Sequence, residues 1–326
     1  MTNTRTIGDA IAITTAWISS SNLQFSSAFI GGSVAYADEG ATYDPASDVD
    51  CYLVIHGDPP QGKIGKIMVE GVLLDVSWIP WSALENGEKD AVLSSLVNFG
   101  RVVRDDGKLG ALQKRIQGRF TTPGAITERL ESMRERIRNG LAGDSSRLPH
   151  PEQVMNWLFP ATLATHIPLI SACRPLTVRK RFLAARDVMD PNAYETLLTL
   201  YGFDDVTREH AQDWLDATTR LFDATADIAV QSSRFWATDI QSDARHIAID
   251  ATQALVDCGN HREALYWILA TSSRCLVVRD DAEESSEGFL EDYRRMVRAL
   301  RLETAEDRRG KARAILTWIQ QDRTAY

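Results

Sequence analysis

Hydrophobic and polar residues follow two different spacings along the chain. Up to about residue 120, short strand-like runs alternate with runs of helical spacing. The strand-like runs are residues 23–30, 48–55, 65–80 and 101–105, and the third is expected to form two strands joined at Glu70-Gly71. Helices are expected at 7–18, at 81–100 with a break at Asn86-Gly87, and at 109–120. This part of the chain therefore predicts strands and helices in alternation, with neighbouring antiparallel strands.

After about residue 122 the strand pattern ends. Every later segment has a helical period, and Gly, Asp-Pro or Asp-Asp sequences separate the segments. The predicted helices are 125–143, 151–172, 176–189, 193–202, 207–233, 243–259, 260–278, 288–301 and 304–321. We expect an α+β domain over residues 1–122, with a small mixed sheet and helices. An all-helical domain is expected over 123–326, with the boundary between 120 and 150.

The amino-acid composition limits the classes of protein to which the chain can belong. The 326 residues suit two domains, and 44% hydrophobic residues are enough for a real core. No run approaches the roughly 20 apolar residues that span a bilayer, and an N-terminus with Asp9 but no basic region is unlike a signal peptide. The four cysteines are far apart, which favours free thiols in a reducing cytoplasm. A net charge of -9 argues against sequence-independent binding of nucleic acid, although a local basic face stays open.

Two aspartates stand at the start of the strand-like run 48–55. Asp48 and Asp50 are two residues apart, so on a strand both side chains point to the same face, while Val49 and Cys51 point to the other. Two carboxylates about 4 Å apart repel by about 4 kcal/mol at an effective dielectric near 20. Protonation of one carboxylate would relieve the repulsion, as in an acid–base dyad. A divalent cation would also relieve it, and oxygen ligands suit Mg²⁺ or Mn²⁺.

A third acid and a glycine-rich turn strengthen the metal interpretation. Asp75 lies in the otherwise apolar run 72–80, where an unpaired buried carboxylate is costly. If this strand neighbours 48–55, three carboxylates converge and suit two-metal phosphoryl or nucleotidyl transfer. Gly31-Gly32-Ser33 follows a strand and is expected to open a helical turn, whose backbone N–H groups and serine hydroxyl suit a phosphate.

This combination resembles the signature of the DNA polymerase β-type nucleotidyltransferase superfamily. The residues that carry the resemblance are Gly31-Gly32-Ser33, Ser47-Asp48-Val49-Asp50-Cys51 and Leu74-Asp75-Val76, within roughly residues 20–120. A helical second half is similar to the arrangement in bacterial adenylyltransferases that modify aminoglycosides and lincosamides. The resemblance implies transfer of a nucleoside monophosphate, most simply AMP from Mg-ATP, to a hydroxyl of a small antibiotic-like molecule. It also implies metal binding by Asp48, Asp50 and Asp75, and phosphate binding by Gly31, Gly32 and Ser33.

The sequence departs from the family pattern in two places. Fourteen residues separate Ser33 from Asp48, so we expect an enlarged loop, whose Asp38, Glu39 and Asp44 are candidate lining for a cationic acceptor. Many family members carry an arginine shortly after the Gly-Ser pair, where this chain has Ala35-Tyr36-Ala37. The candidates for the triphosphate contact are therefore Lys63, Lys66 and the basic residues Arg174, Arg179, Lys180 and Arg181, with Lys180 included in the predicted cofactor-binding set.

Several alternatives stay open at the level of sequence. Asp48 and Asp50 also fit a turn with solvated acids, Asp75 a structural ion pair, and Ser33 a helix N-cap. The basic stretch also fits a solvated helix face. For function, the alternatives are nucleotidyl transfer to tRNA or protein, and a non-catalytic protein that binds or senses a nucleotide.

Overall fold

The computed structural model describes residues 5–44, 47–60 and 64–321, and its described part combines a five-stranded mixed sheet with many helices. This confirms the predicted mixture of α and β structure. The strand order is β3-β4-β2-β1-β5; β2 and β4 run parallel, and the other neighbours are antiparallel. The strands are β1 Ser27–Ile30, β2 Val49–Ile55, β3 Gly65–Val69, β4 Val72–Pro80 and β5 Arg101–Arg104.

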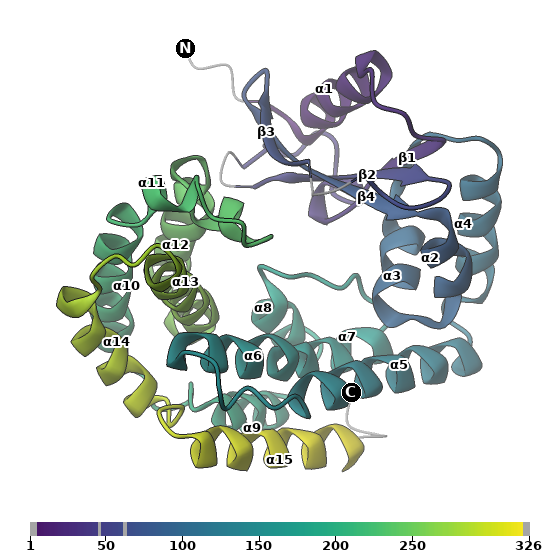
Figure 1. Cartoon of the computed structure of the whole chain (residues 1–326). Coiled ribbons are helices and arrows are strands. Elements are labelled where there is room, and N and C mark those ends of the chain that lie inside the picture. The colour runs from purple at the N-terminus through teal and green to yellow at the C-terminus, as the bar shows by residue number, and fades with distance from the viewer. Residues whose placement is uncertain (1–4, 45–46, 61–63, 322–326) are drawn as a thin grey trace. The chain divides into compact units, whose positions relative to one another are not determined.

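The sheet separates two hydrophobic clusters, because alternate residues of each strand face opposite sides. Helix α1 (Ile7–Ser20) covers one face, and its apolar side packs on residues such as Val49, Cys51 and Leu74. Helices α2 (Trp81–Asn86), α3 (Ala91–Phe99) and α4 (Lys108–Arg119) lie on the other side of the strands (Figure 1). Their cluster includes Phe29 and Val54 from the sheet.

Local sequence fixes the ends of these helices. Thr6 and Asp9 form a capping box at the start of α1, in which each side chain accepts the backbone N–H of the other residue. Asp90 caps α3 through the N–H groups of Val92 and Leu93. The predicted break at Asn86-Gly87 separates α2 from α3, with a short 3₁₀ turn between them.

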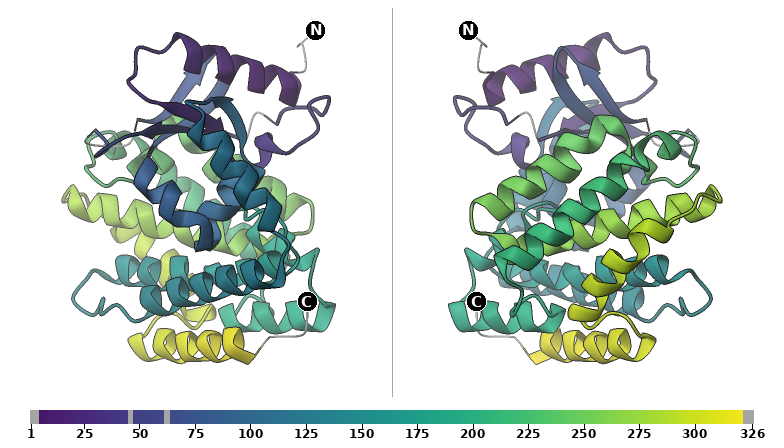
Figure 2. Two further views of the ribbon diagram at one scale, coloured as in Figure 1. Left: turned by 90° about the vertical axis from the view of Figure 1, so that its right-hand side faces the viewer. Right: turned by 90° about the vertical axis from the view of Figure 1, so that its left-hand side faces the viewer.

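The remaining residues form helices. They are α5 Pro123–Leu141, α6 His150–Thr162, α7 His166–Ser171, α8 Arg181–Arg186, α9 Pro191–Tyr201, α10 Arg208–Asp223, α11 Ala226–Ala229, α12 Ala251–Asp257, α13 His261–Asp281, α14 Glu287–Ala299 and α15 Ala305–Gln321. Helix α13 is buried on most sides and packs against α6, α10 and α12. Figure 2 shows these helices from two sides.

The chain divides into two compact units. The first consists of Met1–Ser132 with Cys173–Thr177, and the second of Met133–Ala172 with Val178–Tyr326. The division falls inside α5. The returning segment is fastened within the first unit, where the Leu176 N–H donates to Ser95 Oγ at 3.2 Å and Arg129 Nη2 lies 3.8 Å from Cys173 Sγ.

That returning segment explains one wrong helix prediction. A helix was expected over 176–189, but only Arg181–Arg186 is helical, because the residues up to Thr177 pack non-helically against the first unit. Two other predicted helices are shorter than expected. Helix α10 ends at Asp223, and α12 is preceded by a single π-helical turn, His246–Asp250.

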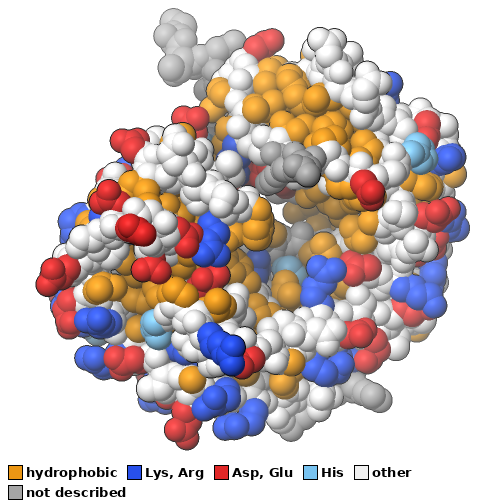
Figure 3. Space-filling model, in the orientation of Figure 1, with side chains coloured by type: hydrophobic (Ala, Val, Ile, Leu, Met, Phe, Trp, Pro, Cys, Tyr) orange, Lys and Arg blue, Asp and Glu red, His pale blue; other side chains and the backbone are white. Residues whose placement is uncertain are grey.

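The surface carries both signs of charge. Acidic and basic side chains are interspersed over the helical unit on the face shown in Figure 3. Among the described residues, no helix combines the length and the apolar character needed to cross a bilayer.

Candidate functional site

One row of the sheet brings together three ionisable residues from three strands. Lys66 on β3 is the register partner of Asp75 on β4, and Asp75 is the register partner of Asp50 on β2. Side chains at paired positions of neighbouring strands stand on the same face. The strands that carry Asp50 and Asp75 are therefore neighbours, the condition on which the sequence interpretation depended.

Lys66 connects this row to Asp48. Its Nζ donates to Asp48 Oδ2 at 2.5 Å and to Asp75 Oδ2 at 3.5 Å. The Lys66 side chain is only 8% exposed, compared with 29% for Asp48 and 14% for Asp75. A largely buried cation therefore lies among the carboxylates, and it offsets part of their mutual repulsion.

The two faces of β2 divide as the alternation predicts. Val49 and Cys51 are fully buried in the cluster under α1. Tyr52, two residues after Asp50, stacks on Phe29 at 5.1 Å between ring centroids, on the α2–α4 side. Burial raises the pKa of the Tyr52 hydroxyl, and the charges of Asp50, Asp75 and Asp48 raise it further. All three carboxylates thus lie within electrostatic reach of one phenol.

The glycine turn lies directly against Asp50. Gly31 donates its N–H to the Asp50 carbonyl at 2.9 Å, and a Cβ on Gly31 would lie 2.7 Å from Tyr52 Cε2. Gly32 has φ 62° and ψ -166°, a conformation open almost only to glycine. A Cβ on Gly32 would lie 2.1 Å from Asp50 Oδ2. Both glycines are therefore required by the close approach of the turn to the β2 side chains.

A 3₁₀ turn, Ser33–Ala35, follows as predicted. Ser33 is exposed, but Gly32 takes the N-cap position and the turn has no side-chain cap, so the N-cap interpretation of Ser33 is wrong. Tyr36 ends the turn and packs edge-on against Phe99. Desolvation raises the pKa of Tyr36, Arg174 opposes this shift and Asp50 adds to it.

The loop before Asp48 is held at several points. Tyr43 is 4% exposed, and its hydroxyl donates to the Ser47 carbonyl at 2.5 Å, one residue before Asp48. Burial raises the pKa of Tyr43 to about 12, and the Asp48 charge contributes. The N–H groups of Ile7 and Gly8, in the first turn of α1, donate to loop carbonyls at 2.9 Å.

The acidic loop residues have local roles. Glu39 pairs with Arg101 at 2.6 Å, and Asp38 accepts the Gly40 N–H at 2.9 Å. Asp44 precedes residues 45–46, which lie outside the described part of the chain. Lining of an acceptor site by these acids stays a prediction.

The basic residues that are candidates for the triphosphate contact lie in different parts of the structure. Lys63 lies outside the described residues, and Lys66 contacts the acids as above. Arg174 belongs to the segment that packs with the first unit and is exposed there. The helical unit holds the others, where Lys180 is exposed and Arg179 lies over the Trp267 ring.

Arg181 has a structural environment. It is 4% exposed, donates to Thr162 Oγ1 at 2.8 Å and lies over the Tyr266 ring at 4.4 Å. A side chain held in this way inside the helical unit is not available for the phosphate contact that the sequence suggested. The role of Lys180 stays a prediction.

The chemistry of the donor set fits a divalent cation. Carboxylate oxygens from Asp48, Asp50 and Asp75 are hard ligands of the kind that Mg²⁺ and Mn²⁺ prefer. A positive group, the Lys66 ammonium, already lies between two of them. Within residues 5–44, 47–60 and 64–321, however, no three His, Cys, Asp or Glu side chains converge as a formed metal site. In this arrangement Asp48 and Asp75 both contact the Lys66 ammonium.

Sequence reasoning considered Lys66 only as a phosphate ligand and missed its pairing with the acids. A signal was available. A two-residue loop at Glu70-Gly71 pairs Val69 with Val72, and counting outward pairs Lys66 with Asp75. The predicted hairpin therefore already contained this contact.

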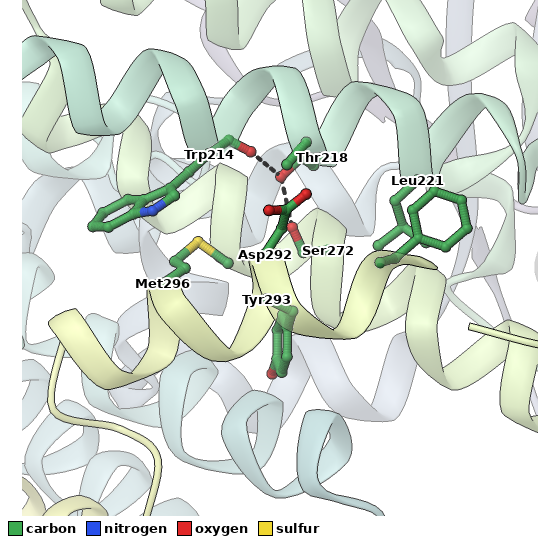
Figure 4. Close-up of a pocket in the computed structure, with 9 residues that line it drawn as sticks. Trp214, Thr218, Leu221, Ser272, Asp292, Tyr293 and Met296 are labelled. Atoms are coloured by element: carbon green, nitrogen blue, oxygen red, sulfur yellow. Dashed lines mark hydrogen bonds between the residues drawn. The ribbon is translucent and has the colours of Figure 1, made fainter. Parts of the chain in front are cut away.

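A separate small pocket lies in the helical unit between α10, α13 and α14 (Figure 4). Thr218 and Ser272 share a hydrogen bond of 2.6 Å beside it. Its volume of about 10 Å³ leaves room for no more than about one water molecule, so it is too small for a substrate. The carboxylate row is the stronger candidate site.

Comparison with known proteins adds no family to these observations. Neither a protein-family model nor a curated protein matches the sequence.

Proposed function

We propose that the protein is a metal-dependent nucleotidyltransferase that moves a nucleoside monophosphate, AMP from ATP as first choice, to a hydroxyl acceptor. The observation that carries the proposal is the contact between the glycine turn and the acids. Gly32 approaches Asp50 so closely that no side chain fits between them, and Asp50 is paired with Asp75 across the sheet. The turn that we propose for phosphate and the acids that we propose for the cation thus adjoin each other in one small region.

Each residue of this region has a part in the proposal. Asp48, Asp50 and Asp75 would hold Mg²⁺ or Mn²⁺, which when bound neutralises charge on the triphosphate and on the attacking and leaving oxygens. The backbone of Gly32 and the exposed Ser33 hydroxyl suit phosphate oxygens. Asp75, on β4, would either act as one of these metal ligands or accept the proton of the acceptor hydroxyl.

Arg174 fits the role of the missing arginine. It contributes to the electrostatics of Tyr36, which follows the glycine turn by three residues. A guanidinium near the turn suits a triphosphate, since planar donors match phosphate oxygens. For the acceptor, a small antibiotic-like molecule is the first choice, and tRNA or protein is the alternative within the same chemistry.

A second candidate function is a nucleotide-binding or sensing protein without turnover. The Lys66 contact favours it, because a permanent ammonium among the acids would replace the cation that transfer requires. The two functions differ in whether the bound nucleotide is transferred to an acceptor.

Calorimetry with ATP tests the proposal directly. We expect binding in the presence of Mg²⁺ and little in EDTA, since three carboxylates without a cation repel a triphosphate. Equal affinity in both conditions would contradict the metal-dependent function.

A transfer screen then separates the candidates. Labelled ATP, GTP and CTP are offered with aminoglycosides, lincosamides, tRNA and the protein itself. Label on an acceptor supports the transferase and names its substrate class. Mg-ATP binding without transfer to any acceptor favours the sensing protein.

A further inference from the structure

Lys66 is an internal counterion of the Asp48 and Asp75 carboxylates. Its ammonium lies 2.5 Å from Asp48 Oδ2 and 3.5 Å from Asp75 Oδ2, and its side chain is only 8% exposed. In the row of paired residues across the sheet, Lys66 stands at one end, Asp75 in the middle and Asp50 at the other end. Lysine is among the residues least often buried without a charged partner, so these contacts hold it in place.

An ammonium and a divalent cation make opposite demands on the same oxygens. A cation bound through Asp48 Oδ2 and Asp75 Oδ2 would compete for the two oxygens to which Lys66 Nζ donates. Two positive groups within about 4 Å also repel strongly at low effective dielectric. The ammonium and a metal ion close to these carboxylates therefore disfavour each other.

We infer that Lys66 competes with the divalent cation for Asp48 and Asp75, so that Lys66 sets the metal affinity of the site and leaves these oxygens when the metal enters. The inference rests on the metal site of the proposed function, but not on nucleotidyl transfer itself. Lys66 is then a positioning and regulatory residue. Without nucleotide, its ammonium keeps metal ions away from the carboxylates. A metal ion that arrives with a triphosphate is accompanied by the negative charge of the phosphates, which offsets the repulsion between the metal and the ammonium.

Removal of the ammonium should therefore raise metal affinity. Mn²⁺ binding without nucleotide is measured by electron paramagnetic resonance of the free ion for the wild type, Lys66→Met and Lys89→Met. Lys89 is the matched control, since it is in the same unit but pairs with Glu128 at 3.3 Å. We expect Lys66→Met to bind Mn²⁺ at least about ten-fold more tightly than the wild type, as loss of one charge-assisted contact allows. Lys89→Met should bind like the wild type.

A structural ion pair would give a different result. If Lys66 only stabilises the fold, Lys66→Met lowers the free energy of unfolding and leaves Mn²⁺ affinity at the wild-type value. Equal Mn²⁺ affinity in folded Lys66→Met and wild type, with folding checked by circular dichroism, overturns the inference.

A measurement on the wild type avoids any folding defect of the variant. Amine labelling read by mass spectrometry should increase at Lys66 when Mn²⁺ is bound and stay constant at Lys89. Bound Mn²⁺ with unchanged labelling of Lys66 also overturns the inference. The proposed function and this inference can fail independently. If Lys66→Met binds Mn²⁺ more tightly but the wild type transfers no nucleotide to any acceptor, the inference holds and the transferase function is wrong.

Discussion

The Gly32 backbone and the Asp50 carboxylate occupy adjoining space, because a Cβ on Gly32 would lie 2.1 Å from Asp50 Oδ2. This contact joins the turn after β1 to the acid row on β2. Glycine is necessary at position 32 for two independent reasons: the backbone φ is 62°, and a Cβ would have no room beside Asp50.

Gly32→Ala should therefore damage the site more than the fold. The backbone conformation alone costs of order 1–3 kcal/mol for a residue other than glycine. The added methyl also pushes the Asp50 carboxylate away, so Mg-ATP binding by calorimetry should fall at least about ten-fold.

Gly57→Ala is the matched control for Gly32→Ala. Gly57 has φ 92°, but a Cβ there meets nothing within 4 Å. It should carry a similar cost in thermal unfolding while leaving nucleotide affinity unchanged. Equal nucleotide affinities for the two variants would show that the Gly32–Asp50 contact has no part in binding.

The three acids should separate by role. Asp48→Asn and Asp50→Asn should weaken Mg-ATP binding and abolish transfer, because these residues are proposed to hold the metal that arrives with the triphosphate. Asp75→Asn should keep most of the Mg-ATP affinity while transfer falls by roughly 10²–10⁴, as for loss of a general base. The measurements are the nucleotide dissociation constant and the single-turnover rate of each variant. Normal transfer by Asp75→Asn would make Asp75 a structural partner of Lys66.

Local sequence predicts the first unit well. The Glu70-Gly71 turn was predicted from two residues, and both have positive φ, 48° and 77°, as a tight hairpin turn requires. The same-face placement of Asp48 and Asp50 stays a prediction, because β2 begins at Val49 and Asp48 lies just before it. The neighbourhood of Asp50 and Asp75 was stated as a condition, and the parallel pairing of β2 with β4 meets it.

Features that depend on distant packing were not predictable in this way. Residues 173–177 return to the first unit through contacts such as Leu176 with Ser95, which are 81 positions apart. Periodicity within a window cannot detect such a partner, so residues 176–177 were assigned to the helix that follows. The contact of Lys66 with Asp48 was missed for a related reason. Asp48 lies 18 positions away, just before β2, and β4 separates β2 from the strand that carries Lys66.

A hydrogen bond inside the helical unit offers a stability test. Glu263 is 5% exposed and accepts from the Tyr194 hydroxyl at 2.9 Å and from Arg186 Nη1 at 3.0 Å. Tyr194→Phe leaves one contact of a buried carboxylate unmade, so we expect a loss of about 1.5–3 kcal/mol in the free energy of unfolding. Denaturant unfolding followed by circular dichroism measures it.

Tyr266→Phe is the matched control for Tyr194→Phe. Tyr266 is 1% exposed, and its hydroxyl makes no hydrogen bond within the described part of the chain. Its removal should be neutral or slightly stabilising, because a buried polar group without a partner is costly. Similar losses for both variants would show that the Glu263 contact adds nothing beyond the general effect of removing a buried hydroxyl.

Lys311 gives the helical unit a pH dependence with a defined sign. Burial, with a smaller effect of the Arg301 charge, lowers the pKa of Lys311 from 10.5 to about 8. Between these values the unfolded chain binds a proton that the folded chain does not, so this group makes stability rise with pH. The penalty for burying the charged form is present in full below pH 8 and disappears as the pH passes 10.5.

Lys311→Met removes this titrating group and keeps most of the apolar stem. The variant should be more stable than the wild type at pH 7, and the difference should shrink steadily as the pH rises from 8 to 10.5. Thermal unfolding of both proteins across this range measures it, and comparison at each pH cancels the titration of the other groups. Lys311 Nζ also donates weakly to the Leu200 carbonyl at 3.4 Å, at the end of α9, and loss of that contact reduces the gain at neutral pH. A difference that stays constant or widens with pH would show that the Lys311 ammonium is not penalised by its surroundings.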